Sequence, residues 1–424
     1  MDHFTLIGGE MHAENVPLSA IAETVGTPAY IYSAATLERH VQVFRDALHG
    51  LEHDGQAPLI AFAVKANPNG AVLATLARLG MGADVVSGGE LARALAAGMK
   101  PDEIVFSGVG KSRDEMAQGL AAGIGQFNVE SVEELDMLSA AAVEAGREAA
   151  IAIRINPDVT AGTHHKISTG SASNKFGIAY ARAMEAYARA ASLPGIRVRG
   201  VAVHIGSQLT DLAPLEAAFG RMGALIGELR AAGHDITHAD LGGGLGVPYD
   251  PALPVPPSPA AYGEMVRRAT KGWNARLTFE PGRLIVANAG ILLSRVILVK
   301  EAETPFVVAD AAMNDLLRPS LYDAWHHIRA VKPDGTERTF NVVGPVCESG
   351  DTFATGRTMD RVAAGDLIAF MTAGAYGATM ASTYNSRALA AEVMVQGDRF
   401  AVVRPRQPVE ALIAAEHLPE WLEG

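Results

Sequence analysis

The chain has 424 residues, and its 35 basic and 47 acidic side chains give a net charge of −12 at pH 7. This charge repels phosphate backbones and anionic lipids, so neither nucleic acids nor membranes are expected partners. Cys347 is the single cysteine, which excludes an intrachain disulfide and a multi-cysteine metal site, and we expect no metal. The N-terminal residues lack a basic region followed by an apolar run, and no stretch approaches about 18 uninterrupted apolar residues, so we expect a cytoplasmic protein.

Short β-rich runs alternate with stretches of helical periodicity over the first two thirds of the chain. The runs lie at 58–64, 82–86, 103–108, 126–130, 150–155, 199–205, 236–242 and 276–281. Apolar residues at helical spacing fill the intervening stretches, as in AVLATLARLG. This alternation predicts an eight-stranded parallel (β/α)8 barrel over residues 36–284, although an open doubly wound sheet fits the same pattern.

After residue 285 the sequence changes to strand-like runs separated by turns, such as ILLSRVILVK, PFVVAD, RTFNVVG, DLIAFM and FAVVRP. These runs predict a C-terminal all-β domain formed by residues 1–35 and 285–424, in which the segment 28–33 is a candidate strand. The proline-rich stretch 250–263 is expected to be an extended loop and not a helix. The polar segment 163–177 is expected to be a loop over the site.

Unusual side chains follow several of the predicted barrel strands, and reactive residues of such barrels lie at the carboxyl ends of the strands. Lys65 ends an apolar strand, where a desolvated ammonium is costly and a neutral, nucleophilic amine is favoured. A lysine that extends to solvent is the alternative. Gly242, Gly243 and Gly244 can present bare backbone N–H groups to a phosphate, or they can form a simple turn.

Four more side chains at strand ends have both a structural and a functional interpretation. Glu280 and Arg283 flank a Pro-Gly turn, where they either pair with each other or each face a ligand. His204 is either a core histidine with satisfied hydrogen bonds or a ring that stacks on an aromatic ligand. Arg154 can pair with a carboxylate of the barrel, and a single arginine does not distinguish a structural from a functional role.

The motifs together resemble, in order and in number, those of the diaminopimelate decarboxylase family. They are FAVKAN (62–67), GADVVSGGEL (82–91), HIGSQ (204–208), LGGGLG (241–246), FEPGR (279–283), DAAMNDLLRPSLYDAWH (310–326), GPVCESGD (344–351) and GAYG (374–377). The resemblance covers nearly the whole chain. GPVCESGD and RPSLYDAWH look like this family and unlike its ornithine decarboxylase relatives, which usually have aspartate after the cysteine.

The resemblance implies a fold of alanine-racemase type, with pyridoxal 5′-phosphate bound in the barrel. Lys65 would carry the cofactor, His204 would stack on its ring, and Glu280 would face the pyridine nitrogen. Arg154 would orient Glu280 from behind, with Asp84 and Glu90 near the lysine. The phosphate would be bound by residues of several loops, namely Ser207, Gly242, Gly243, Gly244, Gly282, Arg283 and Tyr376.

The resemblance also implies the reaction, which is decarboxylation of meso-2,6-diaminopimelate to L-lysine, the final step of lysine biosynthesis. The distal end of the substrate would be bound by side chains outside the cofactor pocket or at its edge, namely Arg283, Arg318, Tyr322, Glu348 and Tyr376. Cys347 would protonate the carbanion left after carbon dioxide departs. The neighbouring subunit would supply this cysteine, so a homodimer with shared active sites is expected.

Three alternatives stay open at this point. The first is a sister decarboxylase that acts on D-lysine, D-ornithine, ornithine or another basic amino acid with the same cofactor. The second is a catalytically inactive regulatory homologue, against which the presence of both Lys65 and Cys347 argues. The third is a racemase on the same barrel, which would release no carbon dioxide.

Overall fold

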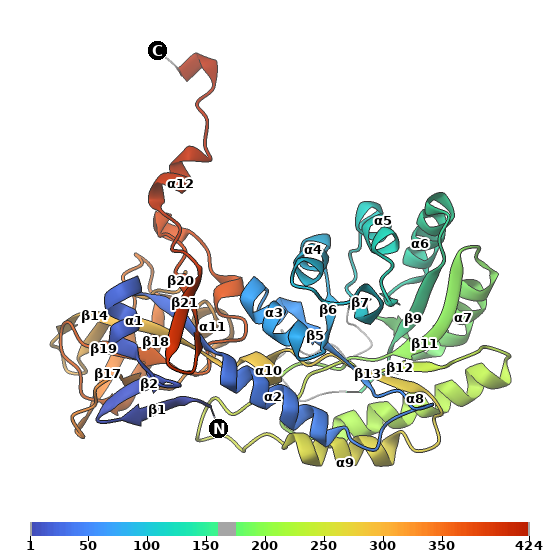
Figure 1. Cartoon of the computed structure of the whole chain (residues 1–424), viewed down its shortest axis with the longest axis horizontal. Helices are drawn as coiled ribbons and strands as arrows, with labels where there is room; N and C mark the ends of the chain where they lie inside the picture. Colours follow the sequence, from blue (N-terminus) through green and yellow to red (C-terminus); the bar gives the residue numbers. More distant parts are fainter. Residues whose placement is uncertain (1, 160–174, 423–424) are drawn as a thin grey trace. The chain divides into compact units, whose positions relative to one another are not determined.

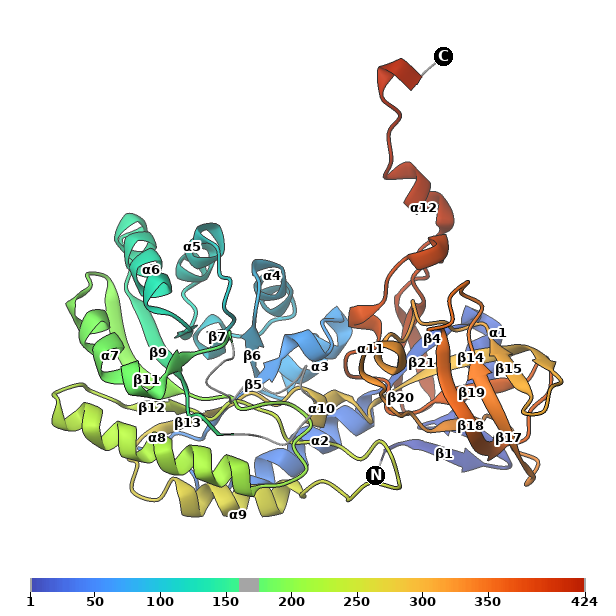
Figure 2. The same cartoon turned by 180° about the vertical axis from the view of Figure 1, so that it is seen from behind.

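The computed structural model describes residues 2–159 and 175–422. Its contacts divide the chain into two compact units, Leu37–Ile285 and Met1–Thr36 with Val286–Gly424, which Figures 1 and 2 show from opposite sides. Residues 163–174, the greater part of the segment expected to form a loop over the site, lie outside the described residues.

The first unit is built on a closed sheet of parallel strands. Each strand pairs with its neighbour in parallel register, and the pairings of β13 with β5 and of β8 with β9 close the sheet into a barrel. The predicted (β/α)8 barrel is confirmed, and the open sheet is excluded. The strands are β5 (Leu59–Ala63), β6 (Gly82–Val85), β7 (Ile104–Phe106), β8 (Gln126–Val129), β9 (Ala149–Asn156), β11 (Ile196–Ala202), β12 (His238–Asp240) and β13 (Arg276–Phe279), and β10 (Ile178–Ala179) pairs with β9.

Helices cover the outside of the barrel (Figure 1). They are α2 (Ala34–Ala47), α3 (Gly70–Arg78), α4 (Gly88–Ala96), α5 (Arg113–Ala122), α6 (Val132–Ala145), α7 (Ala183–Ser192), α8 (Ala213–Ala231), α9 (Pro259–Ala269) and the short α10 (Arg283–Val286). The last strand is therefore followed by only four helical residues. Helix α2, which precedes the barrel in the chain, packs there instead, because the Phe44 ring contacts the rings of Tyr262 and Phe279.

The predicted loop at 250–263 is partly wrong, because helix α9 begins at Pro259. The Ser258 hydroxyl accepts a hydrogen bond from the Ala261 backbone N–H and caps the helix. Proline at the first helical position costs nothing, since its missing N–H would have no partner within the helix and its fixed φ suits the first turn. Residues 250–257, the part of the stretch before Ser258, form no helix or strand.

Serine caps also fix where three of the barrel helices begin. The side chains of Ser87, Ser112 and Ser131 accept hydrogen bonds from the first-turn N–H groups of α4, α5 and α6. Each serine follows a strand of the barrel within a few residues. The caps therefore fix the short turns at the carboxyl end of the barrel, from which the polar side chains of the site project.

The second unit is mostly β-structure. Its strands are β1 (Phe4–Ile7), β2 (Glu10–Ala13), β3 (Val16–Pro17), β4 (Ala29–Ser33), β14 (Gly290–Lys300), β15 (Phe306–Ala309), β16 (Ile328–Ala330), β17 (Glu337–Val343), β18 (Thr352–Asp360), β19 (Leu367–Phe370), β20 (Ala391–Gln396) and β21 (Arg399–Arg404). Three helices accompany them, α1 (Leu18–Val25), α11 (Arg318–Tyr322) and α12 (Val409–Ala414). The candidate strand at 28–33 is confirmed, because β4 pairs with β14 and β20 in the middle of the large sheet.

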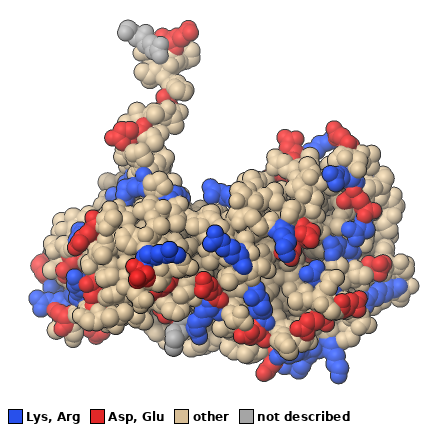
Figure 3. Space-filling model, in the orientation of Figure 1, with Lys and Arg blue, Asp and Glu red and all other residues tan. Residues whose placement is uncertain are grey.

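Acidic and basic side chains are interspersed on the face shown in Figure 3.

No described helix is long and apolar enough to cross a membrane. In the part of the chain that the structure describes, no group of three or more His, Cys, Asp and Glu side chains is arranged to bind a metal ion.

Candidate functional site

Lys65 lies in a single helical turn, Val64–Ala66, directly after β5. Its ammonium donates to Oδ2 of Asp84 on the neighbouring strand β6 at 2.6 Å. The Asp84 carboxylate is fully buried, whereas 40% of the Lys65 side chain is exposed. The expected desolvation of Lys65 is thus wrong for this structure, and the lysine is held by an ion pair at the mouth of the barrel. Oδ1 of Asp84 has no hydrogen-bond partner among the described residues.

Glu90 lies behind this pair at the start of α4. Its Oε2 accepts from the backbone N–H of Val86 at 2.8 Å, which fixes the turn between β6 and the helix. Burial raises the pKa of Glu90, and the ammonium of Lys65 partly offsets this rise. Glu90 therefore interacts with Lys65 through its charge.

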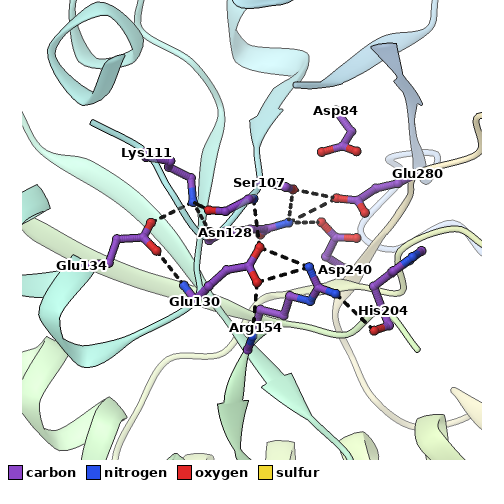
Figure 4. A network of polar contacts seen from close by, with 12 residues as sticks. Asp84, Ser107, Lys111, Asn128, Glu130, Glu134, Arg154, His204, Asp240 and Glu280 are labelled. Carbon is purple, nitrogen blue, oxygen red and sulfur yellow. Dashed lines mark hydrogen bonds and ion pairs between the residues drawn. The ribbon is translucent and has the colours of Figure 1, made fainter. Parts of the chain in front are cut away.

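Glu280 follows β13 and accepts hydrogen bonds from polar side chains at the ends of two other strands, β7 and β8 (Figure 4). Oε1 accepts from the Ser107 hydroxyl at 3.3 Å and from the Asn128 amide at 3.2 Å. The same Asn128 amide nitrogen donates to Oδ2 of Asp240 at 2.9 Å. These contacts join the carboxyl ends of β7, β8, β12 and β13, and they fix the Glu280 carboxyl group at one place in the barrel.

Asp240 and Glu280 are neighbours in the barrel, because the Asn128 amide nitrogen donates to both carboxyl groups. Burial raises the pKa of Asp240 to about 6. Burial, followed by the charges of Asp240 and Asp84, raises the pKa of Glu280 well above its ordinary value. At least one of the two groups is therefore protonated near neutral pH.

Because of this pair, the free energy of unfolding of the protein without cofactor should fall as the pH rises. A carboxyl group whose pKa is raised on folding binds its proton more tightly in the folded state, so its stabilising contribution is complete below its unfolded pKa near 3.8 and is lost as the pH rises through about 6. We expect Asp240→Asn to lose less stability between pH 5 and pH 7 than the unchanged chain. Urea unfolding of both proteins at the two pH values tests this, and equal losses would contradict it.

Arg154 on β9 does not reach Glu280, and this corrects the expectation that it orients that glutamate. Its guanidinium pairs with Glu130 at 3.1 Å and donates to the His204 backbone carbonyl at 3.3 Å (Figure 4). No hydrogen bond or ion pair joins Arg154 and Glu280 among the described residues. Arg154 thus positions the His204 backbone, and Ser107 with Asn128 takes the place expected for it beside Glu280.

His204 follows β11 by two residues and is neutral in this structure. Burial, together with the positive charges of Arg154 and Lys65, lowers its pKa well below the ordinary value. Nδ1 accepts from the Gly243 backbone N–H at 3.3 Å, so the proton of the neutral ring lies on Nε2. A neutral imidazole suits stacking against an aromatic ring.

A buried ion pair supports these residues from behind. The Lys111 ammonium donates to Glu134 at 2.7 Å and to the backbone carbonyls of Gly108 and Asn128. Glu134 in turn accepts from the backbone N–H of Glu130 at 2.9 Å. The pair therefore fixes the end of β8, from which Asn128 and Glu130 project.

Lys111→Met should destabilise the barrel strongly, because it leaves Glu134 buried and unpaired. Removing one partner of a buried pair costs about 3–5 kcal/mol. The matched control is Arg113→Met, since Arg113 pairs with Glu144 on the surface with side-chain exposures of 62% and 70% and should contribute less than about 1 kcal/mol. Urea denaturation measures both, and similar effects of the two substitutions would refute the role of Lys111.

The glycine run follows β12 and accepts only glycine. A Cβ on Gly242, Gly243 or Gly244 would lie 2.5, 2.2 or 2.3 Å from a backbone carbonyl oxygen, and Gly242 and Gly244 have φ of +65° and +113°. Gly282 is less tightly confined, since a Cβ there would lie 3.0 Å from the Cβ of Ala63 at the end of β5 and 3.1 Å from the Cβ of Ala66 in the turn that carries Lys65. The turn therefore keeps its backbone free of side chains, as a phosphate cradle requires.

Arg283 and Ser207 lie together near this turn. The buried Arg283 guanidinium donates to the Ser207 hydroxyl at 3.2 Å and to the Tyr249 hydroxyl at 2.8 Å. Leu209, which follows the HIGSQ motif, donates its backbone N–H to the Gly244 carbonyl at 2.9 Å. A cation and a hydroxyl therefore accompany the glycine run, which is the donor set that binds a phosphate.

The other predicted residues belong to the second unit. Arg318 and Tyr322 lie on α11, where the buried Arg318 guanidinium contacts Nε2 of His326 at 2.9 Å. Tyr376 has a φ of +56°, a backbone conformation that is strained for a tyrosine. Such residues occur preferentially at functional sites.

Cys347 and Glu348 occupy an exposed turn between β17 and β18. The turn is formed by Asp351, whose buried carboxylate accepts from the backbone N–H of Val346 at 2.7 Å and of Met313 at 2.6 Å. The Tyr384 hydroxyl donates to Glu348, and this carboxylate raises the pKa of Tyr384. The sulfur and the carboxylate are therefore presented side by side.

Comparison with known proteins decides the family. Residues 34–287 match the family "Pyridoxal-dependent decarboxylase, pyridoxal binding domain". The chain is 56% identical to a diaminopimelate decarboxylase of Zymomonas mobilis, over 99% of both chains. It belongs to the diaminopimelate decarboxylases, within the pyridoxal-dependent decarboxylases.

Two solved structures of the same family have the same fold. Diaminopimelate decarboxylase from M. jannaschii in complex with L-lysine is 36% identical, covers 99% of both chains and has a TM-score of 0.95. The Helicobacter pylori enzyme, also complexed with L-lysine, is 40% identical, covers 94% of this chain and 98% of that chain, and has a TM-score of 0.89. Like its family, this chain is a decarboxylase that uses pyridoxal phosphate.

The barrel site fits that cofactor. Lys65 offers a primary amine, the glycine run with Ser207 and Arg283 offers phosphate ligands, and the buried Asp84 has an oxygen without a partner. Glu280 offers a carboxyl group for the ring nitrogen.

The sequence analysis missed the residues that hold Glu280, namely Ser107, Asn128 and Asp240, and the Glu130 partner of Arg154. All of them lie at the carboxyl end of a strand, within or next to the runs FSG, FNVE and HADLG. Like Lys65, they are polar residues at the end of an apolar strand. Such residues are rare in barrel strands, so their position in the sequence could have indicated them. Their pairing could not be predicted, because it depends on which side chains meet inside the barrel.

Proposed function

We propose that this chain converts meso-2,6-diaminopimelate to L-lysine and carbon dioxide with pyridoxal phosphate, as the final step of lysine biosynthesis. The observation that carries the proposal is the convergence of Lys65, Glu280 and the glycine run at the carboxyl end of one barrel. The two family members solved with L-lysine support it, because L-lysine would be the product.

When bound, pyridoxal phosphate supplies a ring that accepts the electron pair left by carbon dioxide. In the proposal Lys65 carries the cofactor through its amine, and His204 lies flat against the ring as a neutral imidazole. Glu280 holds a proton at the ring nitrogen, which strengthens the ring as an acceptor. Asp84 and Glu90 set the charge around Lys65, and Arg154 holds the His204 backbone.

The phosphate ligands in the proposal come mainly from loops at the barrel end. They are Ser207, Gly242, Gly243, Gly244, Gly282 and Arg283, together with Tyr376 from the second unit. Arg283 is assigned to both cofactor and substrate, and its contact with Ser207 favours the cofactor.

Substrate selection in the proposal uses charges that match a second amino-acid end. Arg318, with Arg283, Tyr322 and Tyr376, would bind the distal carboxylate, since a guanidinium matches a planar carboxylate with two parallel hydrogen bonds. Glu348 would pair with the distal ammonium. Lysine or ornithine has no distal carboxylate, so it would leave the buried Arg318 without its ligand.

Cys347 is proposed to protonate the carbanion, and the neighbouring subunit of a homodimer is proposed to supply it. An exposed thiol in a turn fixed by Asp351 is suited to reach a partner's site. The C-terminal segment supports a partner chain, because Ile413, Leu418 and Trp421 are 66%, 66% and 84% exposed. A thiol that must stay reduced supports a cytoplasmic location for the proposed reaction.

The test is carbon dioxide release and product identity from meso-diaminopimelate, L-lysine, D-lysine and L-ornithine, with and without added pyridoxal phosphate. We expect cofactor-dependent release from meso-diaminopimelate alone. Release from a simple basic amino acid with diaminopimelate inert would keep the cofactor chemistry and refute the substrate.

A further inference from the structure

Asp240 is a buried carboxyl group at the end of β12, and the reaction as proposed above assigns it no task. Its two oxygens have different partners, because Oδ2 accepts from the Asn128 amide and Oδ1 accepts from the Gly242 backbone N–H, both at 2.9 Å (Figure 4). Glu280 is its neighbour, because the same Asn128 amide nitrogen also donates to Oε1 of Glu280 at 3.2 Å. Only 2% of the Asp240 surface is exposed, so water does not compensate its charge.

The charges around this carboxyl group do not balance. The groups that face the Asp240–Glu280 pair come from each of the packed elements, namely Lys65, Asp84, Ser107, Asn128 and Tyr262. Among them Lys65 is the cation, and it donates to Asp84. The Arg154 guanidinium drawn in Figure 4 is paired with Glu130. Two adjacent carboxylates would therefore repel each other in a water-poor site, and one proton between them relieves this repulsion.

We propose that Asp240 and Glu280 act as one carboxyl pair that holds a single proton, and that Asp240 positions Glu280 and sets its charge toward the ring nitrogen of the cofactor. This inference rests on the proposed contact between Glu280 and that nitrogen. Asp240 is then a positioning residue, since its own partners are Glu280, Asn128 and Gly242.

The proton balance of the pair is simple. Before the cofactor binds, the pair has one O–H bond and one negative charge. When pyridoxal phosphate binds, this O–H bond would break and the proton would pass to the ring nitrogen, so that two carboxylates would face one positive charge and the total charge would be conserved. The second carboxylate makes the nitrogen more basic than Glu280 alone would make it.

The pair is also connected to the phosphate end of the site. Asp240 accepts from the Gly242 N–H, and the Gly242 carbonyl accepts from the Glu280 N–H at 2.8 Å. Gly242 therefore links the turn that is proposed to bind the phosphate with Glu280, which is proposed to face the ring nitrogen. Asp240 sets the separation between them.

The main experiment measures the protonation of the ring nitrogen directly. Each holoenzyme is reconstituted with pyridoxal phosphate labelled with ¹⁵N in the ring, and the nitrogen chemical shift is followed against pH. In Asp240→Asn we expect the titration midpoint of this nitrogen to fall by about 1–3 pH units, the effect of losing a charge within ~4–6 Å. A midpoint equal to that of the unchanged enzyme overturns the inference.

Two further variants separate the possible causes. Ser107→Ala removes a hydrogen bond to a Glu280 oxygen without changing charge, so its titration midpoint should move far less than that of Asp240→Asn. A shift as large as that of Asp240→Asn would make the effect one of packing and overturn the inference. Glu280→Gln should deprotonate the nitrogen outright. If Glu280→Gln has no effect, the proposed role of Glu280 fails, and the inference about Asp240 fails with it.

A measurement on the unchanged protein covers the case in which Asp240→Asn does not fold. The infrared difference spectrum between cofactor-free and cofactor-bound protein should show the loss of one protonated, buried carboxyl band when the cofactor binds. The same band present with equal intensity in both forms would contradict transfer of the proton from the pair.

Discussion

Lys65→Ala should lower the rate of carbon dioxide release from meso-diaminopimelate by about 10³-fold or more, the scale found when a group at the reacting centre is removed. The reason is chemical, because alanine has no amine to carry the cofactor. Asp84 would also lose its ion-pair partner in a fully buried position. The variant should therefore bind pyridoxal phosphate more weakly and lack the absorbance of a covalently held cofactor.

The matched control is Lys100→Ala, which removes an exposed lysine whose ion pair with Glu103 lies on the surface. We expect this variant to keep both the activity and the absorbance of the unchanged enzyme. If Lys65→Ala retained a tenth or more of the unchanged rate (roughly 1.4 kcal/mol or less of lost transition-state stabilisation), Lys65 could not be the residue that carries the cofactor.

Cys347→Ala should slow turnover by about 10²–10⁴-fold, the usual contribution of a positioned proton donor. Substrate binding should change little, because the proposed ligands Arg318 and Glu348 remain, so the loss should appear in kcat and not in KM. Cys347 is the single cysteine of the chain. A thiol-specific reagent should therefore inactivate the unchanged enzyme and label no other cysteine.

Mixing the two inactive variants tests whether the site is shared. A heterodimer of Lys65→Ala and Cys347→Ala subunits has one site with both residues intact only if each site takes its lysine from one subunit and its cysteine from the other. Random exchange makes half of the dimers mixed, so about a quarter of the unchanged activity should return. No recovery after verified subunit exchange would place both residues in the same subunit.

Much of the fold could be predicted from the sequence, because barrel strands buried on both faces appear as short apolar runs and their spacing leaves room for one helix between them. Two details could not. The chain order gives no sign that α2, before the first strand, covers the place after the last one. The start of α9 inside a proline-rich stretch depends on the Ser258 cap, and proline alone favours a loop as readily as a first turn.

The site divides in the same way. Lys65, Glu280 and the glycine run stand out because each is unusual at the end of an apolar strand. Their partners depend on the three-dimensional arrangement of the strands, which the sequence does not show. From the sequence alone, Arg154 could pair with Glu280 or with Glu130. The pairing of β8 with β9 brings Arg154 beside Glu130. Likewise, the ion pair of Lys65 with Asp84 depends on the pairing of β5 with β6, which places Asp84 beside the end of β5.

The most direct measurement of the central claim is the stoichiometry and chirality of the product that the purified holoenzyme forms from meso-diaminopimelate. We expect one L-lysine for each carbon dioxide released, since decarboxylation at the D-centre leaves the L-centre intact. D-lysine, or the consumption of diaminopimelate without carbon dioxide, would contradict it.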